Sequence, residues 1–95
     1  MEREVTVQSE LGLHARPAAS FAALSNRFQS EIWVSRGSDE EWVNGKSVLS
    51  LLSLAAAQGT RLRIRAEGED AREALEALED LIRESRETRE TGTDA

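Results

Sequence analysis

The sequence has no cysteine and contains one histidine and one proline in 95 residues. Without cysteine, the chain can form neither disulfides nor zinc–thiolate sites, and thiol chemistry is excluded. Long apolar runs are also missing, because 51–52 and 54–57 are separated by Ser53 and are far too short to span a bilayer. The first residues enter an alternating pattern directly and do not resemble a signal peptide. We therefore expect a cytoplasmic protein of one small domain.

Positive charge is scarce as well, since the formal net charge is −6. Nucleic-acid binding generally requires a basic face, so this class of function is disfavoured. The chain also lacks a P-loop, a glycine-rich nucleotide fingerprint and a carboxylate cluster for magnesium, and we expect neither cofactor nor metal. The charge is unevenly distributed. Residues 12–28 contain two arginines and the histidine but no acidic residue, whereas acidic residues concentrate at 39–41 and in the C-terminal third.

Strict alternation of apolar and polar residues predicts strands over 3–8, 31–35 and 60–67. Their inward side chains would be Val5, Val7, Ile32, Val34, Leu62, Ile64 and Ala66. Gly37-Ser38 is the predicted two-residue turn to a further strand, because glycine readily adopts a positive φ. This turn would place Trp33 opposite Trp42 on the outer face of the sheet. The tryptophans would act as a cross-strand pair contributing up to about 1 kcal/mol, or as part of an interface.

Apolar spacing of three and four residues predicts helices that begin near Arg16–Pro17, at Ser47 and after Asp70. Proline suits a first helical turn because an N–H there would have no helical partner. Ser47 and Asp70 are predicted N-caps, and Glu73 would complete a capping box for the last helix. The first and last helices should bury Ala18, Phe21, Ala22, Ser25 and Phe28, and Ala71, Ala74, Leu75, Leu78, Leu81, Ile82 and Ser85, respectively.

Residues 1–85 are thus predicted to form one α+β domain with the element order β-α-β-β-α-β-α. Because no parallel βαβ unit repeats, we expect an antiparallel sheet covered on one face by helices. Residues 86–95 are charged and have no apolar periodicity, and we expect them to form a disordered tail.

His14 is the candidate for chemistry. It precedes a predicted helix N-terminus, where unpaired backbone N–H groups and the helix dipole favour an anion. Arg16 adds a permanent cation suited to phosphate oxygens. An unprotonated imidazole is nucleophilic near neutral pH. A nucleophile beside a phosphate cradle predicts a phosphorylation site, with partner proteins supplying what this chain lacks.

The segment Gly12-Leu13-His14-Ala15-Arg16-Pro17-Ala18-Ala19 resembles the active-site signature of HPr, the phosphocarrier of the sugar phosphotransferase system. Residues 44–49 and 51–55 resemble the regulatory-serine segment of the same family, and 58–60 and 67–70 match its later turns. The resemblance covers residues 2–85. It implies an open-faced β-sandwich, with four antiparallel strands under three helices.

The resemblance also implies residue roles. His14 would accept a phosphoryl group from enzyme I and donate it to sugar-specific IIA domains. Arg16 and the backbone amides near Ala15 would hold the phosphoryl oxygens. Phosphorylation of Ser47 by an HPr kinase would add negative charge beside the docking surface. The preference of serine for helix N-caps explains Ser47 equally well, so both interpretations stay open.

The short helix predicted from Ser47 to about Ala55 carries more apolar residues than one face can bury. If Leu51, Leu54 and Ala55 point inward, the other apolar side chains of this helix point outward: Val48, Leu49 and Leu52. They form an exposed apolar patch, and such patches are typical of docking sites. The residues expected to contact partners are Val48, Leu49, Leu52, Ala19, Ala23, Asn26, Arg27 and Lys46. Incidental surface hydrophobes are the alternative.

Three further interpretations compete with a sugar-route carrier. The same chemistry serves a nitrogen-related regulatory branch, and the chain could instead be a regulatory module that acts by docking alone. His14 disfavours the last of these, because a pure docking module does not need it. A free-standing enzyme is disfavoured because one histidine and one arginine make a poor turnover site. We expect a monomer, since both carrier partners must reach the same face.

Overall fold

The computed structural model describes residues 1–9, 12–37 and 41–84. In chain order its elements are β1 (Glu2–Thr6), α1 (Ala15–Ser25), β2 (Glu31–Arg36), β3 (Val43–Asn44), α2 (Val48–Leu52), β4 (Arg61–Glu67) and α3 (Ala71–Glu84). The predicted element order is confirmed. Ser85, expected on the inner face of the last helix, and the tail expected over 86–95 lie outside the described residues.

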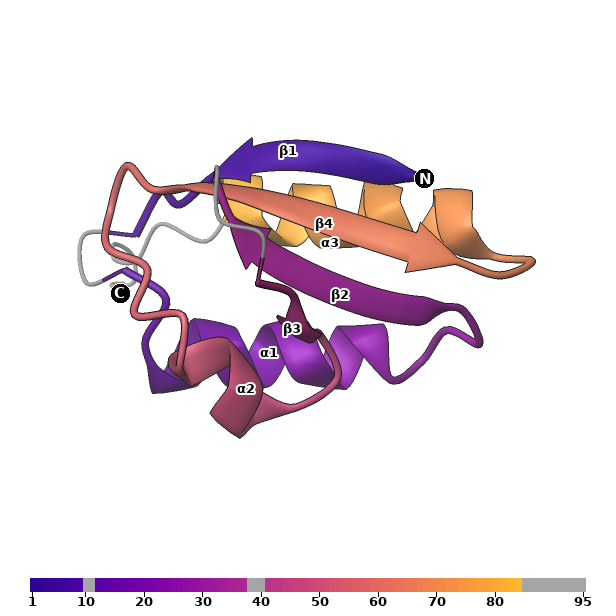
Figure 1. The fold of residues 1–95 in the computed structure, drawn as a ribbon, viewed down its shortest axis with the longest axis horizontal. Helices are drawn as coiled ribbons and strands as arrows, with labels where there is room; N and C mark the ends of the chain where they lie inside the picture. The colour runs from indigo at the N-terminus through magenta and orange to yellow at the C-terminus, as the bar shows by residue number, and fades with distance from the viewer. Residues whose placement is uncertain (10–11, 38–40, 85–95) are drawn as a thin grey trace, which may run out of the picture.

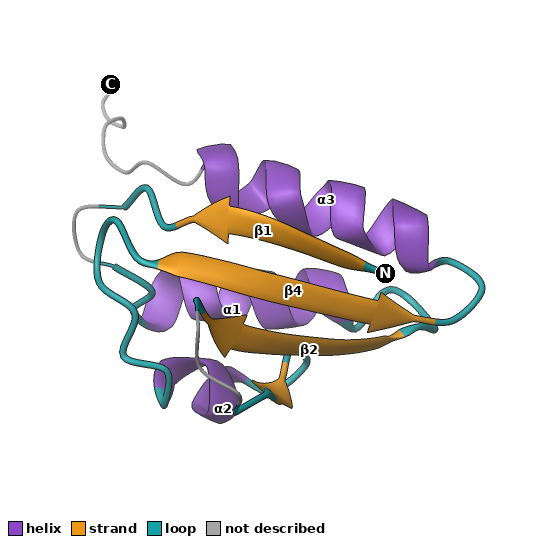
Figure 2. Ribbon diagram, turned by 45° about the horizontal axis from the view of Figure 1, so that its top comes forward, coloured by secondary structure: helices purple, strands orange, loops and turns teal. Residues whose placement is uncertain are grey.

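The four strands form one sheet in the order β1-β4-β2-β3, and every neighbouring pair is antiparallel. Figures 1 and 2 show α1 and α3 behind this sheet, with α2 beside α1 near the β3 edge. No described helix covers the opposite face. The expected open-faced β-sandwich is therefore confirmed.

The core lies between the sheet and the helices. All the predicted inward strand residues are buried, and those of β4 are completely so: Leu62, Ile64 and Ala66. The helices contribute Phe21, Leu51, Leu75 and Leu78, each at most 1% exposed. Burying such a side chain typically contributes about 1.5–3 kcal/mol, so these residues dominate the stability of a domain this small. Phe28 and Leu81, also expected inside, are partly buried against this core.

The predicted pairing of the two tryptophans is wrong. In the structure Trp33 is opposite Asn44 and Val34 is opposite Val43, which is a register two residues away from the expected one. A shift of two residues keeps each side chain on the same face, so the alternating pattern cannot distinguish the two registers. Trp42 instead stacks on β4, with the guanidinium carbons of Arg63 and Arg65 at 4.9 and 5.3 Å from its ring centroid.

The short helix α2 ends at Leu52, three residues before its predicted end at Ala55. Ala55 adopts a φ of +51°, which no right-handed helix can continue, and its side chain is exposed. The turn buries the next residue instead, so Ala56 is only 4% exposed. The expected inward position of Ala55 is therefore wrong, whereas those of Leu51 and Leu54 are confirmed.

Asp70 precedes α3 but does not form the predicted capping box with Glu73. Its carboxylate accepts hydrogen bonds from the backbone N–H groups of Gln29 and Ser30, both at 2.9 Å, and from the Ser30 hydroxyl. These bonds, the Ser30 hydroxyl first, hold the pKa of Asp70 below its usual value. The carboxylate thus fastens the loop before β2 to the start of α3.

Candidate functional site

His14 is the N-cap residue of α1, which begins at Ala15, one residue before the predicted start. Its backbone is extended, with φ −92° and ψ −168°, and its carbonyl accepts the first helical hydrogen bond from the Ala18 N–H at 2.9 Å. The imidazole makes no capping hydrogen bond and is partly exposed. The predicted nucleophile therefore stands at the helix entrance, accessible from outside.

The backbone before His14 is fixed against the segment that follows α2. The Leu13 N–H donates to the Ala56 carbonyl at 2.8 Å. Gly12 has a φ of +77°, and a Cβ atom there would lie 2.4 Å from the same carbonyl oxygen. Only glycine allows this approach, because any side chain would overlap the backbone of Ala56. Figure 1 shows the start of α1 and the segment after α2 at the same end of the molecule.

The first turn of α1 leaves donors available. No described residue accepts a hydrogen bond from the backbone N–H of Ala15 or Arg16, and Pro17 has none to donate. The first turn also contains no acidic residue that would compensate the helix dipole. Arg16, whose side chain carries a permanent positive charge, is exposed. Two amides without an acceptor among the described residues, the positive end of a dipole and a nearby arginine favour an anion such as phosphate beside His14.

Ser47 is the N-cap of α2, as predicted. Its backbone is extended, and its Oγ accepts a hydrogen bond from the Ser50 N–H at 3.2 Å. The residue is partly buried. The capping role explains why serine occupies this position, and it neither requires nor excludes phosphorylation.

The predicted docking residues gather where α1 and α2 pack together. Leu49 is 80% exposed, and Ala19 and Ala23 on α1 are exposed as well. Val48 and Leu52, expected to point outward, are instead partly buried against the core. Their outward assignment is wrong in part, because Val48 and Leu52 are four residues apart and share the side of α2 that adjoins the buried Leu51. We use "α1–α2 surface" for the exposed part, formed by Ala19, Ala23 and Leu49.

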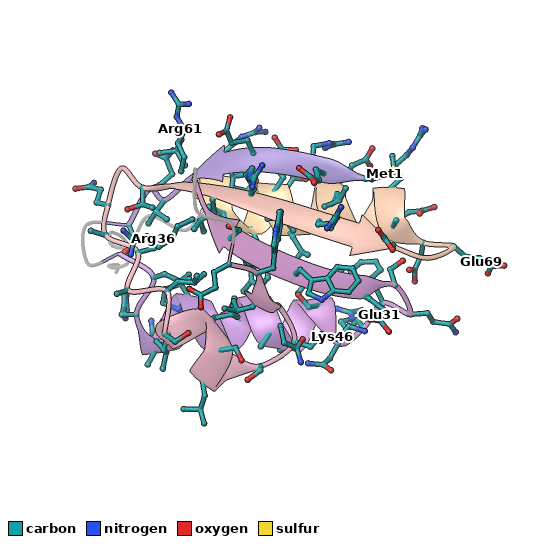
Figure 3. All side chains as sticks on the ribbon, viewed as in Figure 1. Met1, Glu31, Arg36, Lys46, Arg61 and Glu69 are labelled. Carbon is teal, nitrogen blue, oxygen red and sulfur yellow. The ribbon has the colours of Figure 1, made fainter. Side chains whose placement is uncertain are left out.

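The polar residues among the predicted partner contacts have different surroundings. The Asn26 side-chain amide donates to the carbonyls of Ala22, at 2.7 Å, and Lys46, at 3.0 Å, and so ties α1 to the loop before α2. The Lys46 ammonium donates to the Phe28 carbonyl at 2.9 Å, and Figure 3 shows its position below the sheet. Arg27 is exposed. Lys46 therefore has a structural partner, whereas Arg27 carries its charge at the surface.

The sequence interpretation missed the support of the His14 loop. Beyond the Leu13–Ala56 bond, the Arg36 guanidinium donates to the Leu54 carbonyl at 3.1 Å, so the end of β2 holds the exit of α2. Gly12 was the one available signal, since a glycine before a helix often marks close backbone contact. Neither Arg36 nor Ala56 carries a motif that would identify it.

Two features of the described residues bear on other functions. The described part of the chain contains no group of three or more histidine, cysteine, aspartate or glutamate residues that could hold a metal ion. Among the described helices, none has the length and apolar character needed to cross a membrane.

Known proteins are similar to this sequence over most of its length. The family model for the PTS HPr component phosphorylation site matches residues 1–84. Phosphocarrier protein HPr of Neisseria meningitidis serogroup A is 40% identical over 73 residues, covering 77% of this chain and 80% of that protein. The HPr-like protein Crh of Halalkalibacterium halodurans is 45% identical over 73 residues, covering 77% of this chain and 84% of its own.

Solved structures are similar in both fold and sequence. HPr from Thermoanaerobacter tengcongensis superposes with a TM-score of 0.81 and 42% identity, covering 87% of this chain and 91% of that one. Crh of Bacillus subtilis, described as a dimer with a swapped domain, gives 0.71 and 41% and covers 90% and 97% of the two chains. The match to the family model, the relatives and the shared fold agree with the motif around His14, and the chain belongs to the HPr family of the phosphotransferase system.

Proposed function

We propose that this protein is a phosphocarrier that accepts a phosphoryl group on His14 from phosphorylated enzyme I and passes it to sugar-specific IIA domains. The observation that carries this proposal is the N-terminus of α1, where His14 directly precedes the N–H groups of Ala15 and Arg16, for which no described residue is the acceptor. The protein would work in the cytoplasm as a carrier, without turnover of its own.

The transfer itself needs little from this chain. An imidazole nitrogen, Nδ1 by family resemblance, attacks phosphorus, and the N–P bond forms while the donor's bond to the phosphoryl group breaks. The phosphoryl oxygens then accept hydrogen bonds from the Ala15 and Arg16 amides, with the Arg16 guanidinium adding charge. Because these donors are fixed by the helix, they stabilise the charge without rearrangement.

Docking would use the α1–α2 surface. An exposed leucine on α2 and exposed alanines on α1 offer apolar contacts on two helices that pack together, one of which begins at His14, and the cations Arg27 and Lys46 favour acidic partners. Val48 and Leu52 connect this surface to the core, against which they are partly buried. Asn26 keeps α1 and α2 together through its bond to the Lys46 carbonyl before α2. Phosphorylation of Ser47 by an HPr kinase would add negative charge at its margin and weaken binding to acidic partners.

A regulatory module is the second candidate. Relatives named Crh are as similar to this chain as those named HPr, at 45% and 40% identity. Such a protein would act by docking, with Ser47 as the switch. His14 and the open amides beside it favour the carrier. A nitrogen-branch carrier would use the same site with a different enzyme I.

A phosphotransfer assay separates these functions. The protein is incubated with phosphoenolpyruvate and enzyme I of either the sugar route or the nitrogen branch, and the adduct is detected by mass and tested for acid lability. The proposal predicts one acid-labile, alkali-stable phosphoryl group from the sugar-route enzyme, absent in His14→Ala. Labelling by the nitrogen-branch enzyme alone would favour that branch. No labelling by either enzyme, with labelling of Ser47 by an HPr kinase, would favour the regulatory module.

The oligomeric state belongs to the proposal too. A monomer leaves the α1–α2 surface open to both partners in turn. HPr from T. tengcongensis and Crh have also been solved as dimers, so light scattering on this protein is the direct check. A dimer at working concentration would contradict the expected monomer.

A further inference from the structure

The segment that follows α2 carries an unusual backbone conformation. Ala55 has a φ of +51°, a region that an L-residue with a side chain enters only where its surroundings impose it. The carbonyls on either side of it are both in use. Leu54 accepts from the Arg36 guanidinium at 3.1 Å, and Ala56 accepts from the Leu13 N–H at 2.8 Å.

Arg36 reaches this segment because of its place in the sheet. It ends β2, where it is opposite Leu62 of β4, and alternation puts it on the same face as the buried Ile32 and Val34. Its side chain therefore extends on the helix-covered side at the very end of the strand. Figure 3 shows Arg36 beside the segment after α2, whereas Arg61 at the same end of the sheet points away from it.

The contacts form a continuous connection from the sheet to the nucleophile. The guanidinium is a charged donor, and hydrogen bonds from charged donors are stronger than neutral ones. It holds Leu54 and thereby the left-handed turn at Ala55, which presents the Ala56 carbonyl to the Leu13 N–H, directly before His14. Gly12 packs against the same carbonyl with no room for a side chain, so a shift of Ala56 would displace the loop.

We infer that Arg36 is a positioning residue for His14, acting through Leu54 and Ala56 to keep the phosphoryl-accepting loop in place. The inference rests on the proposed phosphocarrier function. The bond from Arg36 to Leu54 lies on the path to the His14 loop, so we expect the effect of Arg36 to be on placement. Small displacements of a nucleophile slow a transfer reaction considerably, since the reacting atoms must be aligned.

The test compares Arg36→Ala and Arg36→Lys with Arg61→Ala as a matched control. Arg61→Ala also removes one positive charge from this end of the sheet, but among the described residues the Arg61 guanidinium makes only a long ion pair, with Glu4 at 3.8 Å. Two quantities are measured on the full chain. One is hydrogen exchange of the Leu13 amide relative to core amides such as that of Ile64, and the other is the rate of phosphoryl acceptance from phosphorylated enzyme I.

In Arg36→Ala we expect Leu13 exchange to rise roughly tenfold relative to the core, as local opening becomes easier, and phosphoryl acceptance to slow by a similar factor, roughly tenfold. Arg36→Lys should restore part of both, because a lysine keeps a charged donor. Arg61→Ala should change neither.

Three outcomes would overturn the inference. Unchanged Leu13 exchange in a folded Arg36→Ala variant would show that Arg36 does not hold the loop. A uniform rise in exchange across core amides would show a general stabilising role only. Slower transfer with normal Leu13 exchange would place Arg36 in partner binding. A wild-type chain that accepts no phosphoryl group would defeat the proposed function and with it the role in transfer, whereas the exchange comparison needs no enzyme I and would still report on the loop.

Discussion

The N-termini of α1 and α2 share a backbone conformation but differ in how their amides are satisfied. His14 and Ser47 are both extended N-cap residues, and neither helix has an acidic residue in its first turn. Ser47 closes its helix with its own hydroxyl, whereas the His14 side chain makes no such bond. An N-cap serine typically contributes about 1 kcal/mol, so α1 forgoes stability that α2 has.

The difference teaches how to recognise a binding position in a small domain. Donors at a helix start that no side chain satisfies find their acceptor in water or in a ligand. At α1 the amides of Ala15 and Arg16 have no acceptor among the described residues and lie next to His14, so a phosphoryl group on His14 would supply one. At α2 the amide is already taken. Changing either cap, or the residues next to it, tests the contrast.

The largest effect is expected from closing α1 with a cap. His14→Ser should abolish acid-labile phosphorylation completely, because the nucleophile is gone. Relative to His14→Ala, it should also raise the free energy of unfolding by about 1 kcal/mol, since a serine hydroxyl can accept from the first turn. Phosphotransfer assays and urea denaturation measure the two effects. An unfolded His14→Ala variant would contradict the placement of His14 in a surface loop.

A smaller effect is expected at the first turn of α2, where Leu49→Glu should weaken binding to enzyme I by roughly tenfold, as for an interface residue of central importance. Stability should change little, within about 0.5 kcal/mol, because Leu49 is exposed and an acidic residue suits a helix start. Thr6→Glu, at an exposed position of β1, is the control for added charge. Calorimetric titration and thermal melts provide the readouts, and a Leu49→Glu chain that unfolds would show Leu49 to be part of the core.

Removing the cap of α2 should have a modest effect on stability alone. Ser47→Ala leaves the Ser50 N–H without its acceptor and should lower the free energy of unfolding by about 1 kcal/mol. Ser47→Asp retains an acceptor and should keep most of the stability. Urea denaturation of both variants measures the difference. Equal stability of Ser47→Ala and the wild type would mean that the hydroxyl contributes nothing as a cap.

The smallest effect concerns Asp70, which directly precedes α3 as His14 and Ser47 precede their helices. Unlike the Ser47 hydroxyl, its carboxylate accepts hydrogen bonds from residues outside its own helix, Gln29 and Ser30. Because its pKa is lowered in the folded chain, its contribution to stability is complete above the unfolded pKa and is lost as pH falls through the folded pKa. Asp70→Asn should flatten the decline in stability on going from about pH 5 to about pH 2. Urea denaturation across this range is the measurement, with Glu69→Gln as the exposed control. An unchanged slope in Asp70→Asn would show that these bonds do not couple protonation to folding.

Much of the fold follows from local patterns, and the errors share a physical cause. Alternation and helical spacing identify the buried faces because burial dominates the energy of folding. The predicted strand register at Trp33 is wrong because a shift of two residues leaves every side chain on the same face of the sheet. The turn at Ala55 was missed because alanine is a good helix former and carries no mark of a left-handed residue.

The site could be found from sequence only in part. The helix start after His14 is marked by Pro17, and the family motif points to the same residue. The support from Arg36 and Ala56 could not be predicted, because it depends on contacts between elements distant in the chain. Asp70 shows the same limit, since its pattern suggested a local cap and its actual partners lie at 29 and 30.

The pairing of β1 with β4 has a consequence for the order of events during synthesis. β1 is synthesised before β4, its strand partner, which is the last strand of the sheet in chain order, and the Met1 amine donates to the Ala66 carbonyl 65 residues later. Contacts so distant in sequence form slowly, and a chain still emerging from the ribosome has no partner for its first strand. The loop of His14 directly follows that strand and rests on Ala56. If the proposed function holds, competence to accept a phosphoryl group arises only with completion of the whole domain, and unfinished chains would not compete for enzyme I.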